Sequence, residues 1–287
     1  MLLYELAPHI ITEKMTTGQL RIWRSCIEHI VDFTNIANEQ NDMYLTYIEV
    51  ARRMRDPSTP EFTANFVTHC GKQGAFTDLI QAQYELAVFY HAMGAFEDAL
   101  NIYNDLHQLL PNYPNEDIEQ MLQIQHARIA IAQNVPVKAL ELLKDCNQRR
   151  VEVQILKCEA LYQQGMYQRC LNLVQHSLKQ SNLSVRLQST LHTIAGRIYQ
   201  AWHDTENAII HFNEALILSE YAGDVLDMCR AHTNLVSAQL MLHKHISALE
   251  LTQATEELKY VRQQQKVAGD YVGLEATQRT LKFIESI

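Results

Sequence analysis

Histidine is the residue in this sequence best suited to metal binding or acid–base chemistry, and 13 histidines are present. Two of them, His243 and His245, flank a lysine, and His203 lies in the stretch 202–206. Residues two positions apart do not share a helix face, and a zinc site needs three or four spaced ligands, which this sequence does not supply. We therefore predict that these histidines are solvated turn residues and that the protein binds no metal and no cofactor.

The six cysteines form no CxxC pair, and their spacing matches neither a zinc site nor a small disulfide framework. An isolated thiol in a helical protein is most often a small, buried, inert side chain. We predict structural thiols, with a redox role as the alternative. The positions are Cys26, Cys70, Cys146, Cys158, Cys170 and Cys229.

Motifs for catalysis are missing from the sequence. It contains no GxSxG nucleophile elbow, no GxxxxGK[ST] or GxGxxG phosphate loop and no HExxH zinc motif. The adjacent carboxylates Glu256 and Glu257 point apart on a helix, so they do not form an acid–base pair. The sequence predicts that the protein is not an enzyme.

Composition indicates that helices must position these residues. The chain has 9 glycines and 6 prolines, where average usage would give about 20 and about 14, and both residues break helices.

The charge of the chain bears on its partners. The formal charge is −9, from 24 basic and 33 acidic residues, and the only dense basic stretch is 51–55. Nucleic acid and membrane are therefore not expected as partners. A signal peptide and an apolar run of about 18 residues are both missing, which predicts a cytoplasmic protein.

Internal repetition appears from residue 81 onward. Segments of about 10 to 15 residues with helical apolar spacing alternate with very short turns. Small residues recur every 31 to 40 positions in the second helix of each predicted pair, at Ala99, Ala139, Cys170, Ala208 and Ala248. The stretches 191–209 and 231–249 align at an offset of 40, which pairs His192 with His232. We predict that these two histidines lie near one another across a repeat interface, as a packed, hydrogen-bonded pair.

The best copy of the repeat is 86–103. It has a large-then-small pair at Leu86 and Ala87, an aromatic at Tyr90, a turn glycine at Gly94 and a small contact residue at Ala99. Together with its weaker copies, this stretch resembles the tetratricopeptide repeat family over roughly 80–268. The resemblance implies an all-α fold, an α-solenoid of antiparallel helix pairs.

Three parts are expected along the chain. Residues 1–59 form an N-terminal helical bundle or degenerate repeats, residues 60–268 form the repeats, and residues 269–287 form a capping helix or, alternatively, a homodimer interface. In the first part we expect helices at about 17–39 and 42–55, followed by one at about 60–72. The junction between 60–72 and 75–93 is expected to resemble that within 216–232.

The resemblance also implies a concave groove lined by the first helix of each pair, which would bind a protein or an extended peptide. The family's lysine and asparagine clamp for a chaperone tail is missing at the matching positions, so a co-chaperone is not expected. The arginines in the groove offer donors to a carboxylate or a backbone, with pairing to nearby glutamates such as Glu159 as the alternative. The groove residues are Gln81, Tyr84, Val88, His91, Arg128, Glu159, Tyr162, Thr193, Arg197, Gln200, Arg230, Thr233 and Ser237.

These observations predict a non-catalytic scaffold or adaptor that binds protein or peptide, of the kind found in the sensor part of bacterial signalling or transcription-regulatory proteins. The alternative is a regulator whose superhelix changes when a short signalling peptide binds, with Pro57 and Pro60 at the hinge. An enzyme of unrecognised type is the third hypothesis.

Overall fold

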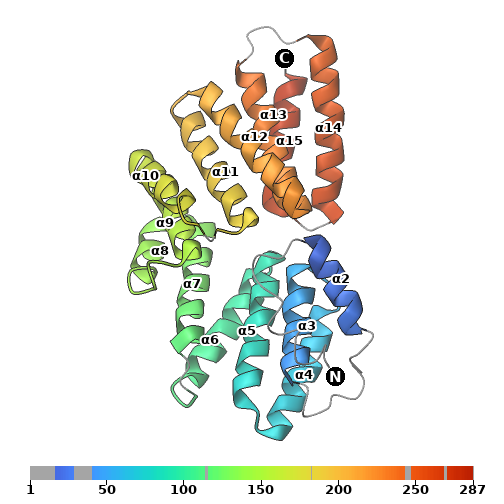
Figure 1. The fold of residues 1–287 in the computed structure, drawn as a ribbon, viewed down its shortest axis with the longest axis vertical. Helices are drawn as coiled ribbons and strands as arrows, with labels where there is room; N and C mark the ends of the chain where they lie inside the picture. Colours follow the sequence, from blue (N-terminus) through green and yellow to red (C-terminus); the bar gives the residue numbers. More distant parts are fainter. Residues whose placement is uncertain are drawn as a thin grey trace. The chain divides into compact units, whose positions relative to one another are not determined.

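The computed structural model describes residues 17–28, 41–113, 116–181, 183–242, 247–267 and 270–286, and these ranges contain helices and turns but no strands. The chain forms two compact units, Met1–Ile129 and Ala130–Ile287, which are described separately. Within each unit, successive helices lie side by side (Figure 1). No helix in the described ranges is both long enough and apolar enough to cross a bilayer.

Unit 1 begins with three helices that precede the best repeat. Helix α3 packs on α2, α4 and α5. The predicted helices at 42–55 and 60–72 are confirmed as α3 and α4, and α2 covers the first part of the predicted helix 17–39, whose remainder lies outside the described residues. The helices are α2 (Thr17–Glu28), α3 (Asn41–Arg53), α4 (Thr59–Gln73), α5 (Phe76–Ala92), α6 (Phe96–Leu109) and α7 (Glu116–Ala132), which runs into unit 2.

Unit 2 continues the same alternation and closes with one additional helix. Helix α12 packs between α11 and α13, and α15 packs against both α13 and α14. The helices are α8 (Pro136–Leu142), α9 (Val151–Gln163), α10 (Tyr167–Leu178), α11 (Val185–Ala201), α12 (Thr205–Ala222), α13 (Val225–Leu242), α14 (Ala248–Val267) and α15 (Tyr271–Glu285).

One turn geometry joins five helix pairs, and we call the first helix of each pair the A helix and the second the B helix. After each of α3, α5, α7, α9 and α11, one residue takes a left-handed conformation. The next residue donates its N–H to the carbonyl five positions earlier, at 2.8 to 2.9 Å, which satisfies a carbonyl that the helix end leaves open. The left-handed residues are Arg55 (φ 56°), Gly94 (φ 79°), Asn134 (φ 58°), Gly165 (φ 71°) and His203 (φ 61°).

The turn at Arg55 shows that α3 and α4 form a pair of the same type as the later repeats. Its connection is two residues longer, because α4 starts four residues after the left-handed position, whereas α6 starts two residues after Gly94. The predicted boundaries at 59/60 and 268/269 separate the repeats from the parts of the chain before and after them, and these boundaries stay a prediction. Compactness divides the chain at 129/130 instead.

The two B-to-A junctions predicted to be alike have the same geometry. Helix α4 ends at Gly74 (φ 73°) and α12 at Gly223 (φ 66°), both left-handed. In each case the following residue donates its N–H to the carbonyl five positions back, at 3.0 and 3.1 Å. This prediction is therefore confirmed.

Small residues are buried at four of the five positions predicted to contact the A helix from the B helix. Ala99, Ala139, Cys170 and Ala208 are all 0% exposed, as predicted. The fifth position is wrong, because Ala248 is the first residue of α14 and is exposed. Helix α14 instead buries Leu258, Val261 and Gln265, so the repeat frame does not continue through it.

The cysteines behave as small apolar side chains. Five are buried, Cys26 is partly exposed, and all six are free thiols. Cys158 on α9 and Cys170 on α10 lie at a helix contact, where each thiol approaches the other residue's backbone carbonyl, at 3.9 and 3.0 Å. Burial raises the pKa of the Cys70 and Cys229 thiols to about 11, so these two remain protonated near neutral pH.

Candidate functional site

The predicted groove residues of unit 1 lie on the A helices α5 and α7. Gln81, Val88, His91 and Arg128 are partly exposed. Tyr84 is only 5% exposed, and its hydroxyl accepts a hydrogen bond from Gln125 Nε2 on α7 at 3.0 Å. Tyr84 therefore fixes α5 to α7 and offers little surface to a ligand.

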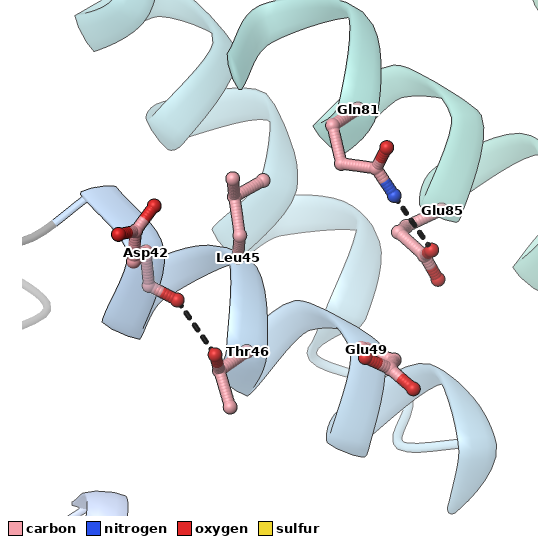
Figure 2. Close-up of a pocket in the computed structure, with 6 residues that line it drawn as sticks. All are labelled: Asp42, Leu45, Thr46, Glu49, Gln81 and Glu85. Carbon is pink, nitrogen blue, oxygen red and sulfur yellow. Dashed lines mark hydrogen bonds between the residues drawn. The ribbon is translucent and has the colours of Figure 1, made fainter. Parts of the chain in front are cut away.

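A pocket of about 190 Å³ lies between the A helices α3 and α5, and we call it the A-helix pocket. Figure 2 shows four of its residues along α3 and two on α5. The α3 residues recur at helical spacing and so share one face of the helix. Of the predicted groove residues, only Gln81 lines this pocket. The lining residues are Asp42, Leu45, Thr46, Glu49, Gln81 and Glu85.

Carboxylates dominate the walls of the A-helix pocket. Glu85 is 5% exposed, forms an ion pair with Arg52, and accepts a hydrogen bond from Gln81 Nε2 at 3.2 Å. Glu49 lies 3.6 Å from the guanidinium of Arg53. Asp42 has no cationic partner among the described residues. The pocket therefore has a net negative lining, which complements a hydrogen-bond donor or a cation.

His91 adds a neutral polar group to the same A-helix layer. Burial, and then the nearby Arg128 guanidinium, lowers the pKa of His91 to about 4. The imidazole is therefore uncharged at neutral pH, with one nitrogen able to donate and the other to accept a hydrogen bond.

In unit 2 the structure brings three predicted groove residues together on α9 and α11. The Arg197 guanidinium lies over the Tyr162 ring, 4.3 Å from its centroid, and Arg197 Nη1 is 3.9 Å from Glu159 Oε1. The alternative prediction, in which the groove arginines pair within the chain, is thus confirmed for Arg197. Thr193 and Gln200, also on α11, are partly exposed.

Helix α15 and the residue that precedes it contact two of the three predicted groove residues on α13, Arg230 and Thr233. Arg230 donates from Nε to Asp270 Oδ2 at 3.0 Å and from Nη2 to Asp270 Oδ1 at 2.6 Å. Thr233 is 2% exposed and shares a hydrogen bond with Thr277 of α15 at 2.9 Å. Ser237 is partly exposed. Arg230 and Thr233 therefore hold the closing helix in place, and sequence reasoning missed this because α15 carries no repeat motif.

The expected pairing of His192 with His232 is wrong. His192 Nδ1 lies 3.0 Å from Nδ1 of His211, and His232 Nε2 lies 3.1 Å from Glu257 Oε2. Each histidine lies on the face of its helix that packs against the next helix in the chain, so its partner comes from that next helix and not from the other histidine.

The turn histidines are predicted to be solvated and to bind no metal. His203 is exposed in its turn, as predicted, and 243–245 lies outside the described residues. The described part of the chain contains no cluster of three or more potential metal ligands.

We expect stability to fall as the pH is lowered below about 6.5, the ordinary histidine pKa. Burial lowers the folded-state pKa of His91, and also those of His192 and His211, so the unfolded chain binds protons that the folded chain rejects. The three contributions are therefore complete above about 6.5 and are lost as the pH falls below it, and the loss from His91, no more than about 3 kcal/mol, continues down to its folded-state pKa of about 4.

Urea denaturation at pH 7.5 and 5.5 measures this loss. His91→Gln should reduce the difference between the two pH values, whereas His107→Gln, at an exposed position on α6, should leave it unchanged. Equal stability at both pH values in the unaltered protein would contradict the prediction.

Comparison with solved structures identifies proteins that are similar to this chain, whereas comparison of sequences does not. No family model matches the sequence, and no curated protein matches it. A Rap protein complexed with competence and sporulation factor matches with a TM-score of 0.56 and 12% identity, over 99% of this chain and 95% of that one. A signal transduction ATPase with numerous domains and a tetratricopeptide repeat sensor, from Pyrococcus horikoshii, matches with a TM-score of 0.55 and 12% identity.

The second match covers 95% of this chain but only 43% of the ATPase, so this chain spans less than half the length of that protein. At this level of identity the likeness establishes the fold. The protein has an all-α, tetratricopeptide-like helical-repeat fold.

Proposed function

We propose that the protein is a non-catalytic scaffold that binds a peptide, or an extended segment of a partner protein, on the A helices of its repeats. The observation that carries this proposal is the A-helix pocket, which opens between two successive A helices and is lined by five polar side chains and Leu45. Support comes from the fold, which is similar to that of a Rap protein bound to competence and sporulation factor and to a tetratricopeptide repeat sensor.

The lining of the pocket indicates which segments it would prefer. Asp42 and Glu49 face it from α3, and Gln81 and Glu85 from α5 (Figure 2). A lysine or arginine side chain would place its apolar stem against Leu45 and its charged end among the carboxylates. We therefore propose that the bound segment carries a basic residue.

Selection from a random peptide library displayed on phage tests this function. The full chain should enrich peptides that contain lysine or arginine. Neutralising the pocket with the near-isosteric pair Asp42→Asn and Glu49→Gln should weaken binding of an enriched synthetic peptide by about tenfold, because charge-assisted hydrogen bonds are lost. Isothermal titration calorimetry measures the change in affinity.

Glu61→Gln is the matched control, since Glu61 is an exposed carboxylate on the B helix α4 of the same unit. It should leave the affinity unchanged. No enrichment above background, or equal binding by the neutralised variant, would contradict the proposal.

The peptide-switched alternative depends on a hinge at 57–60, and the contacts there do not favour one. Asp56 is 7% exposed and accepts hydrogen bonds from the backbone N–H and the hydroxyl of Ser58, at 2.8 and 2.7 Å. Thr59 Oγ1 donates to the Asp56 carbonyl at 2.7 Å. The segment is thus fixed to the turn that ends α3, and the proposed function does not include switching there.

A further inference from the structure

A second pocket lies in unit 2, at the turns that end the A helices α9 and α11. It is an open depression of about 590 Å³, and we call it the turn pocket. Its residues come from the α9–α10 turn and the start of α10, together with one residue from the end of α11, so none of them belongs to the predicted groove. They are Gly165, Met166, Tyr167, Gln168, Arg169 and Trp202.

The wall of the turn pocket is aromatic and apolar. Trp202 is 39% exposed, and Tyr167 and Tyr199 both meet its ring edge-on, with centroids 6.5 and 5.9 Å away. These contacts hold the indole in one orientation, while its N–H donates to no group in the described part of the chain. Met166 is 40% exposed beside it. A fixed, half-exposed tryptophan next to a methionine offers apolar contact area and one free donor to a ligand.

Arg169 supplies positive charge at the same pocket. Its guanidinium lies 3.6 Å from Met166 Sδ and has no carboxylate partner among the described residues. By contrast, Arg186 and Arg197 of the same unit both pair with carboxylates. The acidic residue of the α11–α12 turn, Asp204, caps α12 by accepting hydrogen bonds from the backbone N–H and the side chain of Asn207. In a chain with a net charge of −9, an unpaired guanidinium beside an aromatic wall is complementary to an external carboxylate.

We propose that the turn pocket is a second interaction surface, which binds a peptide segment of a partner protein that carries a carboxylate next to an aromatic or aliphatic side chain. Arg169 pairs with the carboxylate, and Trp202 and Met166 contact the apolar side chain. The indole N–H of Trp202 donates to a backbone carbonyl of the segment. The charge preference is opposite to that of the A-helix pocket, so the two surfaces select different segments, and this proposal does not depend on the proposed function.

Differential phage selection tests the chemistry of the partner. A random heptapeptide library is selected on the full chain and counter-selected on the double variant Arg169→Gln, Trp202→Ala. Both positions are at the surface, and far-UV circular dichroism confirms that the variant is folded. We expect enrichment of peptides with Asp or Glu beside an aromatic or aliphatic residue. No differential enrichment, or enrichment of basic peptides, would overturn the proposal.

Fluorescence then locates the binding site, because the chain has only two tryptophans. In a Trp23→Phe background, titration with an enriched synthetic peptide free of tryptophan should produce a saturable change in Trp202 emission. Arg169→Gln should weaken this binding by about tenfold, whereas Arg279→Gln, at an exposed position on α15, should not. Equal affinity for the unaltered protein and Arg169→Gln would sink the proposed pairing.

Discussion

Arg230→Ala is expected to destabilise unit 2 by up to about 3 kcal/mol, because it removes the guanidinium, itself 42% exposed, that pairs with the buried Asp270 carboxylate. The Asp270 side chain is 2% exposed and is paired through both oxygens with the Arg230 fork. Asp270 also caps α15 by accepting the Gly273 N–H at 3.2 Å. The ion pair thus joins α13 to the start of α15, and its loss should loosen the closing helix. Urea denaturation followed by circular dichroism measures the change in the free energy of unfolding.

The pH dependence of this variant separates charge from packing. Loss of the Arg230 guanidinium would raise the folded-state pKa of the buried Asp270 carboxyl, so the folded variant would bind a proton more readily than the unaltered folded protein does. The penalty should therefore shrink as the pH falls toward that pKa. Adding Asp270→Asn to Arg230→Ala should recover part of the stability at neutral pH, because the amide retains an oxygen for the cap without the charge. A penalty that is independent of pH and unrelieved in the double variant would contradict this account.

Gly196→Ala is the second substitution with a large expected effect, about 1–3 kcal/mol of destabilisation from overpacking. A Cβ at position 196 on α11 would lie 2.5 Å and 2.6 Å from two ring carbons of Phe212 on α12. Phe212 is 0% exposed, so the ring has little room to move. The change therefore forces apart the two helices of one repeat. Urea denaturation followed by circular dichroism measures the change in the free energy of unfolding.

The cause can be isolated with two further variants. Phe212→Leu removes the ring that the new methyl group would meet, so it should be far less harmful in the Gly196→Ala background than in the unaltered protein, with a coupling energy of about 1 kcal/mol or more. Gly71→Ala is the matched control, because its Cβ would meet only Leu79 Cδ1, at 3.8 Å. It lies within helix α4 and should stabilise the protein by about 0.5–1 kcal/mol. Additive effects at 196 and 212 would refute the overpacking explanation.

Several local features of this fold can be read from the sequence because they depend on a few adjacent residues. Gly94 and Gly165 mark two turns, since glycine takes the left-handed conformation without strain. Small residues at 99, 139, 170 and 208 mark close helix contacts, because only a small side chain lets two helix backbones approach. The sequence predicts an interruption after the helix at about 42–55, but not that Arg55 takes the left-handed conformation, because arginine adopts it only where the surrounding structure holds it there.

The candidate binding surfaces were much less accessible to sequence reasoning. Gln81, one of the predicted groove residues, lines the A-helix pocket, but the predicted groove contained no residue of α3, which supplies the rest of that pocket together with Glu85. It also assigned Arg230 and Thr233 to an open groove, although Arg230 pairs with Asp270, just before α15, and Thr233 is buried against Thr277 of α15. The turn pocket combines residues from two turns that are almost 40 positions apart, and no local pattern marks that combination.

By itself, then, the sequence determined that the chain is built of paired helices, where most of them turn, and which small residues lie between them. These properties follow from backbone conformation and side-chain volume, which act over a few residues or within one helix pair. Only the tertiary structure decided which polar side chains remain open to a partner. That depends on which element covers each helix face, and a closing helix such as α15 is positioned by contacts between α13 and α15 that lie some 40 residues apart, as from Arg230 to Asp270.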